Sequence, residues 1–320
     1  MLYTIENNKL KVTILSLGAT INSFIDKETN TDMVLGFDKE EDYLQNRGPY
    51  LGATVGRYAN RISKGTFSIK GIEYHTPIND KVNTLHGGEG FSFKEFSLKD
   101  KTENSVTFVF FSKDGDDGFP GNIDLEVKYE LIENKLLISY SAISDKETVL
   151  NLTNHSYFNL DGGKKDIKDH ELRVYTDRVA LLDENGLSTD VTKRVDGTSF
   201  DFREFKKIND NFLKLDDNLS GGGIDHNFVF ETLDMKKLVT IQNDKLRVTI
   251  SSDLPDVQIY TSNFLGNIKG KYGIDYHNYY GVAIEPQYYP NSINYIEYLK
   301  PIIKANTEVK HFIEYKVEKR

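Results

Sequence analysis

The feature of this sequence that most constrains its fold is a two-residue alternation of apolar and polar side chains, which recurs along all 320 residues. Segments such as LKVTIL, SVTFVFFS, IDLEVKYELI and KLRVTI combine this alternation with β-branched and aromatic residues, which is typical of half-buried β-strands. Turn sequences at residues 70–71, 133–134 and 243–244 separate neighbouring segments and predict antiparallel hairpins. A helical pattern occurs only at residues 40–45 and 203–215. We therefore expect an all-β protein with few short helices.

The number of short strands also constrains the architecture. Many strands with turn signals between them indicate a sandwich or a barrel, and this chain is longer than a small closed barrel needs. No Pro- or Ser-rich linker, composition shift or fixed-period repeat divides the sequence. We expect a single domain, residues 1–320, folded as a large antiparallel β-sandwich.

Composition excludes several kinds of chemistry. The sequence has no cysteine, so a thiol nucleophile, a disulfide and metal sites built from thiolates are all excluded. A formal net charge of −9 without a sustained basic stretch argues against nucleic acid or an anionic membrane as a partner. The first residues lack the basic and apolar regions of a secretory signal, and no apolar run is long enough to span a bilayer. We expect a cytoplasmic protein with a small neutral ligand.

Standard catalytic motifs are absent, so the candidate residues are polar side chains on predicted strands. In TVLNLTNHSYFNL, alternation puts Leu152 and Phe158 on one face and His155 and Tyr157 on the other. The second face is polar and aromatic. A lone histidine is more often a hydrogen-bonded structural residue than a catalyst, and spacing alone leaves both interpretations of His155 open.

A second polar face occurs in YGVAIEPQYYPNSIN, where Glu285 shares a side with Ala283 and Gln287. Apolar and aromatic neighbours disfavour the charged carboxylate, so its pKa should be raised, as suits a general base near neutral pH. A glutamate paired with a structural Arg or Lys is the alternative. In VQIYTSNF, Gln258 and Tyr260 share a face, and an amide beside an aromatic ring suits the hydroxyls and C–H faces of a sugar.

Seven segments give a more specific indication when they are taken together: GRYANRISKGTF, NTLHGG, DGFPGN, TNHSYFNL, IDHNF, VQIYTSNF and IEPQYYPNSIN. In this order they resemble the motif series of the aldose 1-epimerase (galactose mutarotase) family, from roughly residue 10 to the C-terminus. The resemblance implies a β-sandwich with an open sugar-binding cleft. It also implies an isomerase that interconverts the anomers of free hexoses such as galactose and glucose, without a metal or organic cofactor.

The resemblance assigns roles to individual residues. The family's glutamate, matched by Glu285, removes the proton from the anomeric hydroxyl, and its histidine, matched by His155, protonates the ring oxygen. This mechanism asks for an ionised Glu285 and a protonated His155 at rest. The sugar-binding positions of the family fall on five further residues: Asn60, Arg61, His86, Asp225 and Gln258.

Other functions remain open at this point. A family member could act on a phosphorylated sugar or a disaccharide, and a phosphate would call for an additional Arg or Lys cluster at the cleft. A glycoside hydrolase could use Asp225 and Glu285 as its carboxylate pair. A sugar-binding protein without catalysis is the third alternative, although this chain retains both the acid and the base.

Overall fold

The turn sequences at residues 70–71, 133–134 and 243–244 each close an antiparallel hairpin in the computed structural model, which describes residues 1–209 and 222–320. The longest hairpin joins β12 (Ile123–Ile132) to β13 (Lys135–Ser144). Every second residue of β12 from its first position is buried, as the two-residue alternation requires. The prediction of an all-β protein is confirmed.

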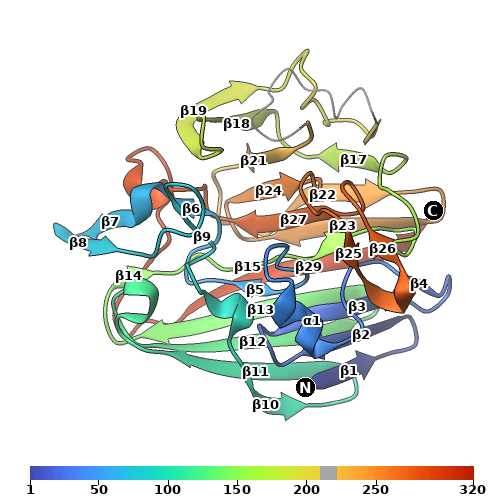
Figure 1. Ribbon diagram of the computed structural model, residues 1–320, viewed down its shortest axis with the longest axis horizontal. Coiled ribbons are helices and arrows are strands. Elements are labelled where there is room, and N and C mark those ends of the chain that lie inside the picture. The colour runs from blue at the N-terminus through green and yellow to red at the C-terminus, as the bar shows by residue number, and fades with distance from the viewer. Residues whose placement is uncertain (210–221) are drawn as a thin grey trace.

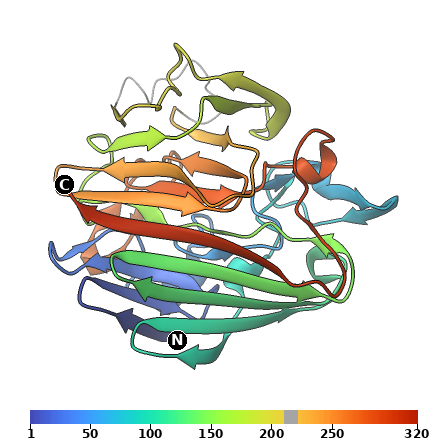
Figure 2. The same ribbon diagram turned by 180° about the vertical axis from the view of Figure 1, so that it is seen from behind.

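One layer of the molecule is a nine-stranded sheet, which faces the viewer in Figure 2. Its strands, in spatial order, are β10 (Ser97–Lys101), β11 (Ser105–Ser112), β12, β13, β29 (Val309–Lys319), β23 (Leu246–Ser252), β22 (Lys236–Gln242), β17 (Glu171–Val174) and β20 (Lys206–Lys207). The C-terminal strand β29 pairs with β13 on one side and with β23 on the other, so it joins the two halves of this sheet.

The opposite layer consists of two smaller sheets (Figure 1). The six-stranded sheet has the order β16 (Tyr157–Phe158), β27 (Val282–Gln287), β24 (Asp256–Tyr260), β21 (Asp225–Val229), β18 (Arg178–Leu182) and β19 (Ser188–Arg194). The four-stranded sheet runs β1 (Leu2–Glu6), β2 (Leu10–Leu15), β3 (Thr20–Asp26) and β4 (Thr31–Asp32).

The main hydrophobic core lies between these layers. It brings together Ile138 and Ile250 of the nine-stranded sheet, Val257 and Ile284 of the six-stranded sheet, and Phe24 of the four-stranded sheet, each fully buried. Burial of aliphatic and aromatic side chains is the main source of stability in such a sandwich. Because one face of the six-stranded sheet is used for this core, its other face is left for polar side chains. The predicted sandwich is confirmed.

Short ladders hold the loops around that open face. β5 (Thr54–Val55) pairs with β15 (Thr153–Asn154), and β6 (Arg61–Ile62) pairs with β9 (Thr84–Leu85). The remaining ladders are β7 (Thr66–Ile69) with β8 (Ile72–His75), β14 (Thr148–Val149) with β28 (Ile302–Ile303), and β25 (Ile268–Lys269) with β26 (Asp275–Tyr276). The ladder of β5 with β15 joins two segments that are far apart in sequence.

Helices are few and short. The predicted helix at residues 40–45 is α1 (Glu40–Gln45). The described 3₁₀ turns are η1 (Ser63–Gly65), η2 (Phe91–Phe93), η3 (Asp116–Gly118), η6 (Lys271–Gly273) and η7 (Ser292–Asn294). The helix predicted at 203–215 is wrong for residues 203–209, where β20 pairs with β17 and sheet pairing overrides local preference; residues 210–215 lie outside the described part of the chain. No helix among the described residues is long and apolar enough to cross a membrane.

Candidate active site

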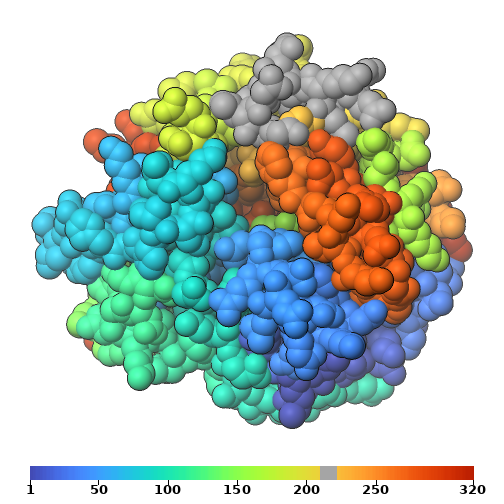
Figure 3. All heavy atoms as spheres, in the orientation of Figure 1, coloured from blue at the N-terminus to red at the C-terminus, as the bar shows by residue number. Residues whose placement is uncertain are grey.

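The open face of the six-stranded sheet carries a cleft of about 330 Å³. Figure 3 shows a hollow in the middle of this side of the molecule, between blue, cyan and orange parts of the chain. All seven residues selected from the sequence line the cleft: Asn60, Arg61, His86, His155, Asp225, Gln258 and Glu285. The structure therefore brings together residues from segments that are more than 200 positions apart in sequence.

Three of these residues stand on neighbouring strands of the sheet. Gln258 on β24 lies directly opposite Glu285 on β27, and Asp225 starts β21, the next strand. Directly opposed residues of an antiparallel pair point to the same side, so the ladder itself aims these side chains at the cleft. The Gln258 side chain donates from Nε2 to Oδ1 of Asp225 over 2.7 Å. Rigid strands thus hold the carboxylate of Glu285 and an amide–carboxylate pair at fixed spacing.

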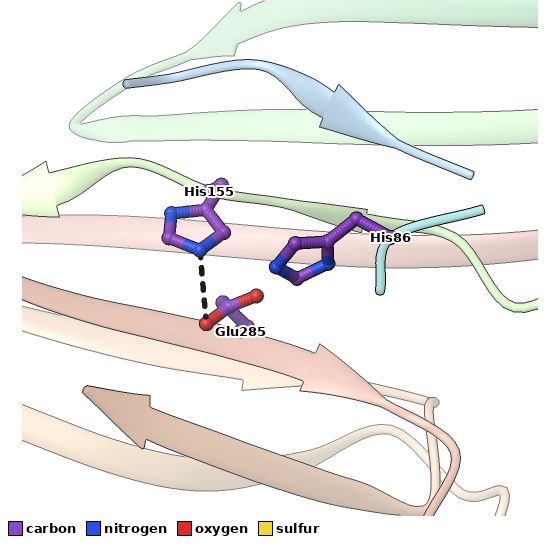
Figure 4. Close-up of side chains that lie close together, drawn as sticks. All are labelled: His86, His155 and Glu285. Carbon is purple, nitrogen blue, oxygen red and sulfur yellow. Dashed lines mark ion pairs between the residues drawn. The ribbon is translucent and has the colours of Figure 1, made fainter. Parts of the chain in front are cut away.

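His155 reaches the cleft from the segment that follows β15. Its backbone N–H donates to the carbonyl of Ala53, and its carbonyl accepts from the N–H of Gly52. These two bonds fix the backbone from which the imidazole projects. Its Nε2 lies 3.5 Å from Oε1 of Glu285, and both side chains are buried (Figure 4). A histidine from the segment between β15 and β16 and a glutamate from β27 thus face each other in the cleft, and their groups can exchange a proton.

His86 is the third side chain of this cluster and points toward the other two in Figure 4. Its ring lies 5.3 Å from that of His155, edge to face. The backbone N–H of Asn60 donates to Nδ1 of His86, so the neutral ring carries its proton on Nε2. Burial lowers the pKa of His86 well below its usual value, and the charge of Arg61, together with that of His155 when its ring is protonated, adds to this effect. His86 is thus a neutral hydrogen-bond donor.

Two histidines and a glutamate are residue types that often bind a metal ion. In this cluster, however, the atoms that would coordinate the metal fit such a site poorly. Potential ligand atoms of His86, His155 and Glu285 lie within 4.8 Å of one another. A metal, however, needs the lone pair of an imidazole nitrogen. The bond from Asn60 leaves Nε2 of His86 protonated, and that atom has no lone pair to offer. Two ligands then remain, fewer than the three that catalytic zinc sites use.

Arg61 supplies a partly buried positive charge to the cleft. Its Nε donates to Oδ2 of Asp80 over 2.7 Å. Burial alone would lower the pKa of Arg61, but the carboxylates of Asp225 and Asp80 outweigh burial and raise it. The guanidinium is therefore a permanent cation that can donate to the oxygen atoms of a ligand.

Burial changes the protonation expected of the acid–base pair. It raises the pKa of Glu285 well above its usual value, with a further rise from Asp225 and an opposing effect from Arg61. The predicted direction for Glu285 is confirmed. Burial also lowers the pKa of His155 from 6.5 to about 4. The expectation of an ionised Glu285 and a protonated His155 at rest is therefore wrong for the sugar-free protein, because the dry cleft disfavours both charges.

The loops of the cleft have an unusual backbone. Tyr50, Asn60 and His86 have φ angles of 54°, 67° and 53°, in the left-handed region that side chains other than glycine disfavour. After His86 the chain packs tightly, since a Cβ at Gly87 would lie 2.6 Å from the carbonyl oxygen of Gly56. Residues in strained conformations cluster at binding sites, where the surrounding structure holds them in place.

Some lining residues could not be found from the sequence. The ring of Tyr50 packs against those of both His86 and His155, with centroids 4.7 and 6.0 Å away, yet no motif marked it. Other unpredicted lining residues are Asp80, Asn185 and Phe264, each from a different loop. Only a pairing of Arg61 with an acidic residue could have been anticipated, because a cation that is largely removed from water favours a carboxylate partner.

The comparison with known sequences places this geometry in a family. Residues 1–316 match the family described as aldose 1-epimerase. The chain is 36% identical to an aldose 1-epimerase of Escherichia coli strain K12, over 98% of this chain and 94% of that protein. It is 37% identical to a galactose mutarotase of Mus musculus, over 97% of this chain and 91% of that protein.

Solved structures agree with the sequence comparison. An aldose epimerase homologue from C. elegans superposes with a TM-score of 0.92 at 28% identity, covering 100% of this chain and 99% of that one. A galactose 1-epimerase from Lactobacillus acidophilus superposes with a TM-score of 0.86 at 28% identity, covering 99% and 93%. With a matching profile over nearly its whole length, relatives above one-third identity and the same sandwich fold, this chain belongs to the aldose 1-epimerase family.

Proposed function

We propose that this protein is an aldose 1-epimerase, which interconverts the α and β anomers of a free hexose such as galactose or glucose. The observation that carries the proposal is the placement of Nε2 of His155 at 3.5 Å from Oε1 of Glu285, inside a cleft lined with hydrogen-bonding groups. Relatives that carry the names aldose 1-epimerase and galactose mutarotase support the same activity.

In this mechanism Glu285 is the base and His155 is the acid. The carboxylate takes the proton of the anomeric hydroxyl while the imidazolium gives a proton to the ring oxygen. The bond between the anomeric carbon and the ring oxygen breaks, and the anomeric C–O bond becomes a carbonyl. Rotation about the bond between the first two carbons presents the other face of the aldehyde. Reversal of both proton transfers closes the ring to the other anomer.

The two pKa directions are compatible with this mechanism because the pair holds one proton throughout. In the resting protein that proton lies on Glu285, and in the form that opens the ring it lies on His155. These two forms have the same net charge, so the ratio between them does not depend on pH. Ring opening converts the charged form, which burial disfavours, into the uncharged form, which burial favours.

Five residues are proposed to bind the sugar: Asn60, Arg61, His86, Asp225 and Gln258. Arg61 and the Nε2–H of His86 are donors. Asp225 is an acceptor for hydroxyl groups, and Oε1 of Gln258 is buried without a partner among the described residues. A sugar hydroxyl both donates and accepts, so it can satisfy groups of either kind.

The proposal includes a cofactor-free mechanism, a monosaccharide as the ligand and a cytoplasmic location. The tautomer of His86, which leaves the cluster one ligand short, supports a mechanism without a metal. The formal net charge of −9 supports the absence of a nucleic-acid or anionic-membrane partner. We propose one domain spanning residues 1–320, and the hydrophobic core, which draws on strands from β1 to β29, supports this.

The proposal is tested by polarimetry of freshly dissolved α-galactose and α-glucose, with protein against buffer alone. Faster approach to the equilibrium rotation is the expected result. Methyl α-galactoside is the matched control, because its blocked anomeric oxygen cannot undergo ring opening. Release of reducing sugar from this glycoside would instead identify a hydrolase that uses Asp225 and Glu285.

A further inference from the structure

Polar atoms without partners gather beside Glu285 on the cleft face of the six-stranded sheet. Six of the thirteen such buried atoms among the described residues lie on the adjacent strands β21, β24 and β27: Nδ2 and Oδ1 of Asn227, Nε2 and Oε1 of Gln287, Oε1 of Gln258 and Oε2 of Glu285. Asn227 and Gln287 are fully buried. More than nine-tenths of buried polar groups in proteins have a partner, so this concentration requires an explanation.

The sheet register places these side chains together. Asn227 on β21 lies opposite Gln258 on β24, which in turn lies opposite Glu285 on β27. Gln287 follows Glu285 by two residues and therefore points to the same side. The Cβ atoms of side chains directly opposite or two positions apart on one face lie about 5 to 8 Å from each other. None of the six atoms has a hydrogen-bond partner among the described residues, so a small bridging molecule is needed to satisfy them.

Water is the small molecule whose hydrogen-bonding groups match these atoms. Gln258 and Glu285 line the open cleft, but Asn227 and Gln287 do not. A sugar bound in the cleft would therefore leave the amides of Asn227 and Gln287 without hydrogen-bond partners. Each amide offers donors and an acceptor, and a buried water makes about three hydrogen bonds to groups of this kind. We propose that Asn227 and Gln287 hold a cluster of buried water molecules against Oε2 of Glu285, and are positioning residues for the base in the function proposed above.

Such a cluster gives the two carboxylate oxygens separate tasks. Oε1 faces His155, while Oε2 has no protein partner among the described residues. A water that donates to Oε2 stabilises the ionised carboxylate and opposes the effect of burial. Among the described residues, the titratable groups near Glu285 include His155, His86, Arg61, Asp225, Tyr157 and Tyr315, and Asp256 lies opposite Gln287. The waters thus hold the base in place and keep its proton transferable.

A high-resolution crystal structure of the sugar-free protein tests the cluster directly. We expect ordered waters within hydrogen-bond distance of both amides, one of which also contacts Oε2 of Glu285. Amides bonded to each other, or a space without ordered water, would overturn the proposal. This measurement does not depend on activity, so its failure is distinguishable from failure of the epimerase assay.

Variants test the positioning role. Gln287→Met and Asn227→Leu keep side-chain volume and remove the amides, so kcat should fall about 10- to 100-fold while KM changes little. The alkaline limb of the pH profile should move to higher pH, because a drier carboxylate holds its proton more tightly. Gln287→Asn, which keeps an amide, should recover part of the lost kcat. An unchanged kcat and alkaline limb in both apolar variants would overturn the role.

A matched control separates this role from a loss of stability. Thr240 is buried in the nine-stranded sheet and bonds to the hydroxyl of Thr249, away from the lining of the cleft. Thr240→Val should lower the resistance to urea and leave the pH profile unchanged. A shift of the alkaline limb in Thr240→Val as large as in Gln287→Met would show that the shift reports stability, and would also overturn the role.

Discussion

Because His155 and Glu285 share one proton, we predict an unusual pH dependence of the epimerase rate. In the unmodified protein, kcat/KM, which reports the pKa values of the sugar-free protein, should form a bell, because activity requires one proton on the pair. Burial moves the pKa of His155 from 6.5 to about 4, which corresponds to roughly 3 kcal/mol against adding a second proton. The acid limb should therefore fall near pH 4. The alkaline limb should fall at the raised pKa of Glu285, above which the pair has no proton.

Replacement of His155 by Asn should reverse the alkaline behaviour. Of the pair, only Glu285 then titrates, and it must be ionised to act as the base. The value of kcat/KM should therefore rise with pH through the region where the unmodified protein loses activity. The asparagine has no proton to give to the ring oxygen. Loss of a general acid should lower the whole profile by about 10²- to 10⁴-fold.

Exchange spectroscopy of the two anomers by NMR, with a buffer blank subtracted at each pH, measures both profiles. His86→Asn is the control, because a residue that only binds the sugar can lower kcat while the bell remains. A falling alkaline limb that persisted in His155→Asn would refute the shared-proton reasoning. If the falling alkaline limb persisted in His155→Asn and vanished in His86→Asn, the acid would have to be His86.

Three further predictions concern the base, the metal and the fold. Glu285→Gln should lower kcat by about 10²-fold or more and leave sugar affinity in calorimetry nearly unchanged; a normal kcat would exclude Glu285 as the base. Chelation by EDTA should leave the rate of anomerisation unchanged, and a loss restored by a divalent ion would contradict the metal-free mechanism. Lys271 is buried 2.6 Å from Oδ2 of Asp32, so Lys271→Met should reduce the free energy of unfolding in urea by about 3 to 5 kcal/mol. The exposed ion pair of Lys310 is the control, and an equal effect of Lys310→Met would contradict that argument.

The strand-borne part of the site could be predicted from periodicity, and the loop-borne part could not. Glu285 and Gln258 were identified because polar residues at alternate positions of apolar strands are conspicuous, and direct pairing in the ladder puts them side by side. Asn60 and His86 lie in loops, where alternation carries no information, and only the family motifs indicated them. Tyr50 could be predicted neither from strand periodicity nor from the family motifs, because neither marks it.

Two predictions from the sequence, a helical conformation of residues 203–209 and the charge state of His155 and Glu285, are wrong for the same physical reason. The helix expected at 203–215 follows from local sequence, but residues 206–207 complete the edge of a sheet whose other strands are distant in the chain. The charge state of the acid–base pair was misjudged because motifs identify His155 and Glu285 without their surroundings. Their pKa values depend on how completely the loops around them exclude water. Both properties are set by tertiary contacts.

Because Tyr50, Asn60 and His86 have a left-handed backbone, substitutions there that increase thermal stability are expected to reduce sugar turnover. A left-handed conformation costs a residue with a side chain about 1 to 2 kcal/mol, a cost that glycine avoids. Glycine at any of these three positions would relax the chain and remove a ring or an amide from the cleft. Selection for heat resistance alone would therefore erode the cleft first at these positions. An engineered thermostable variant should keep them constant and seek its improvements elsewhere in the sandwich.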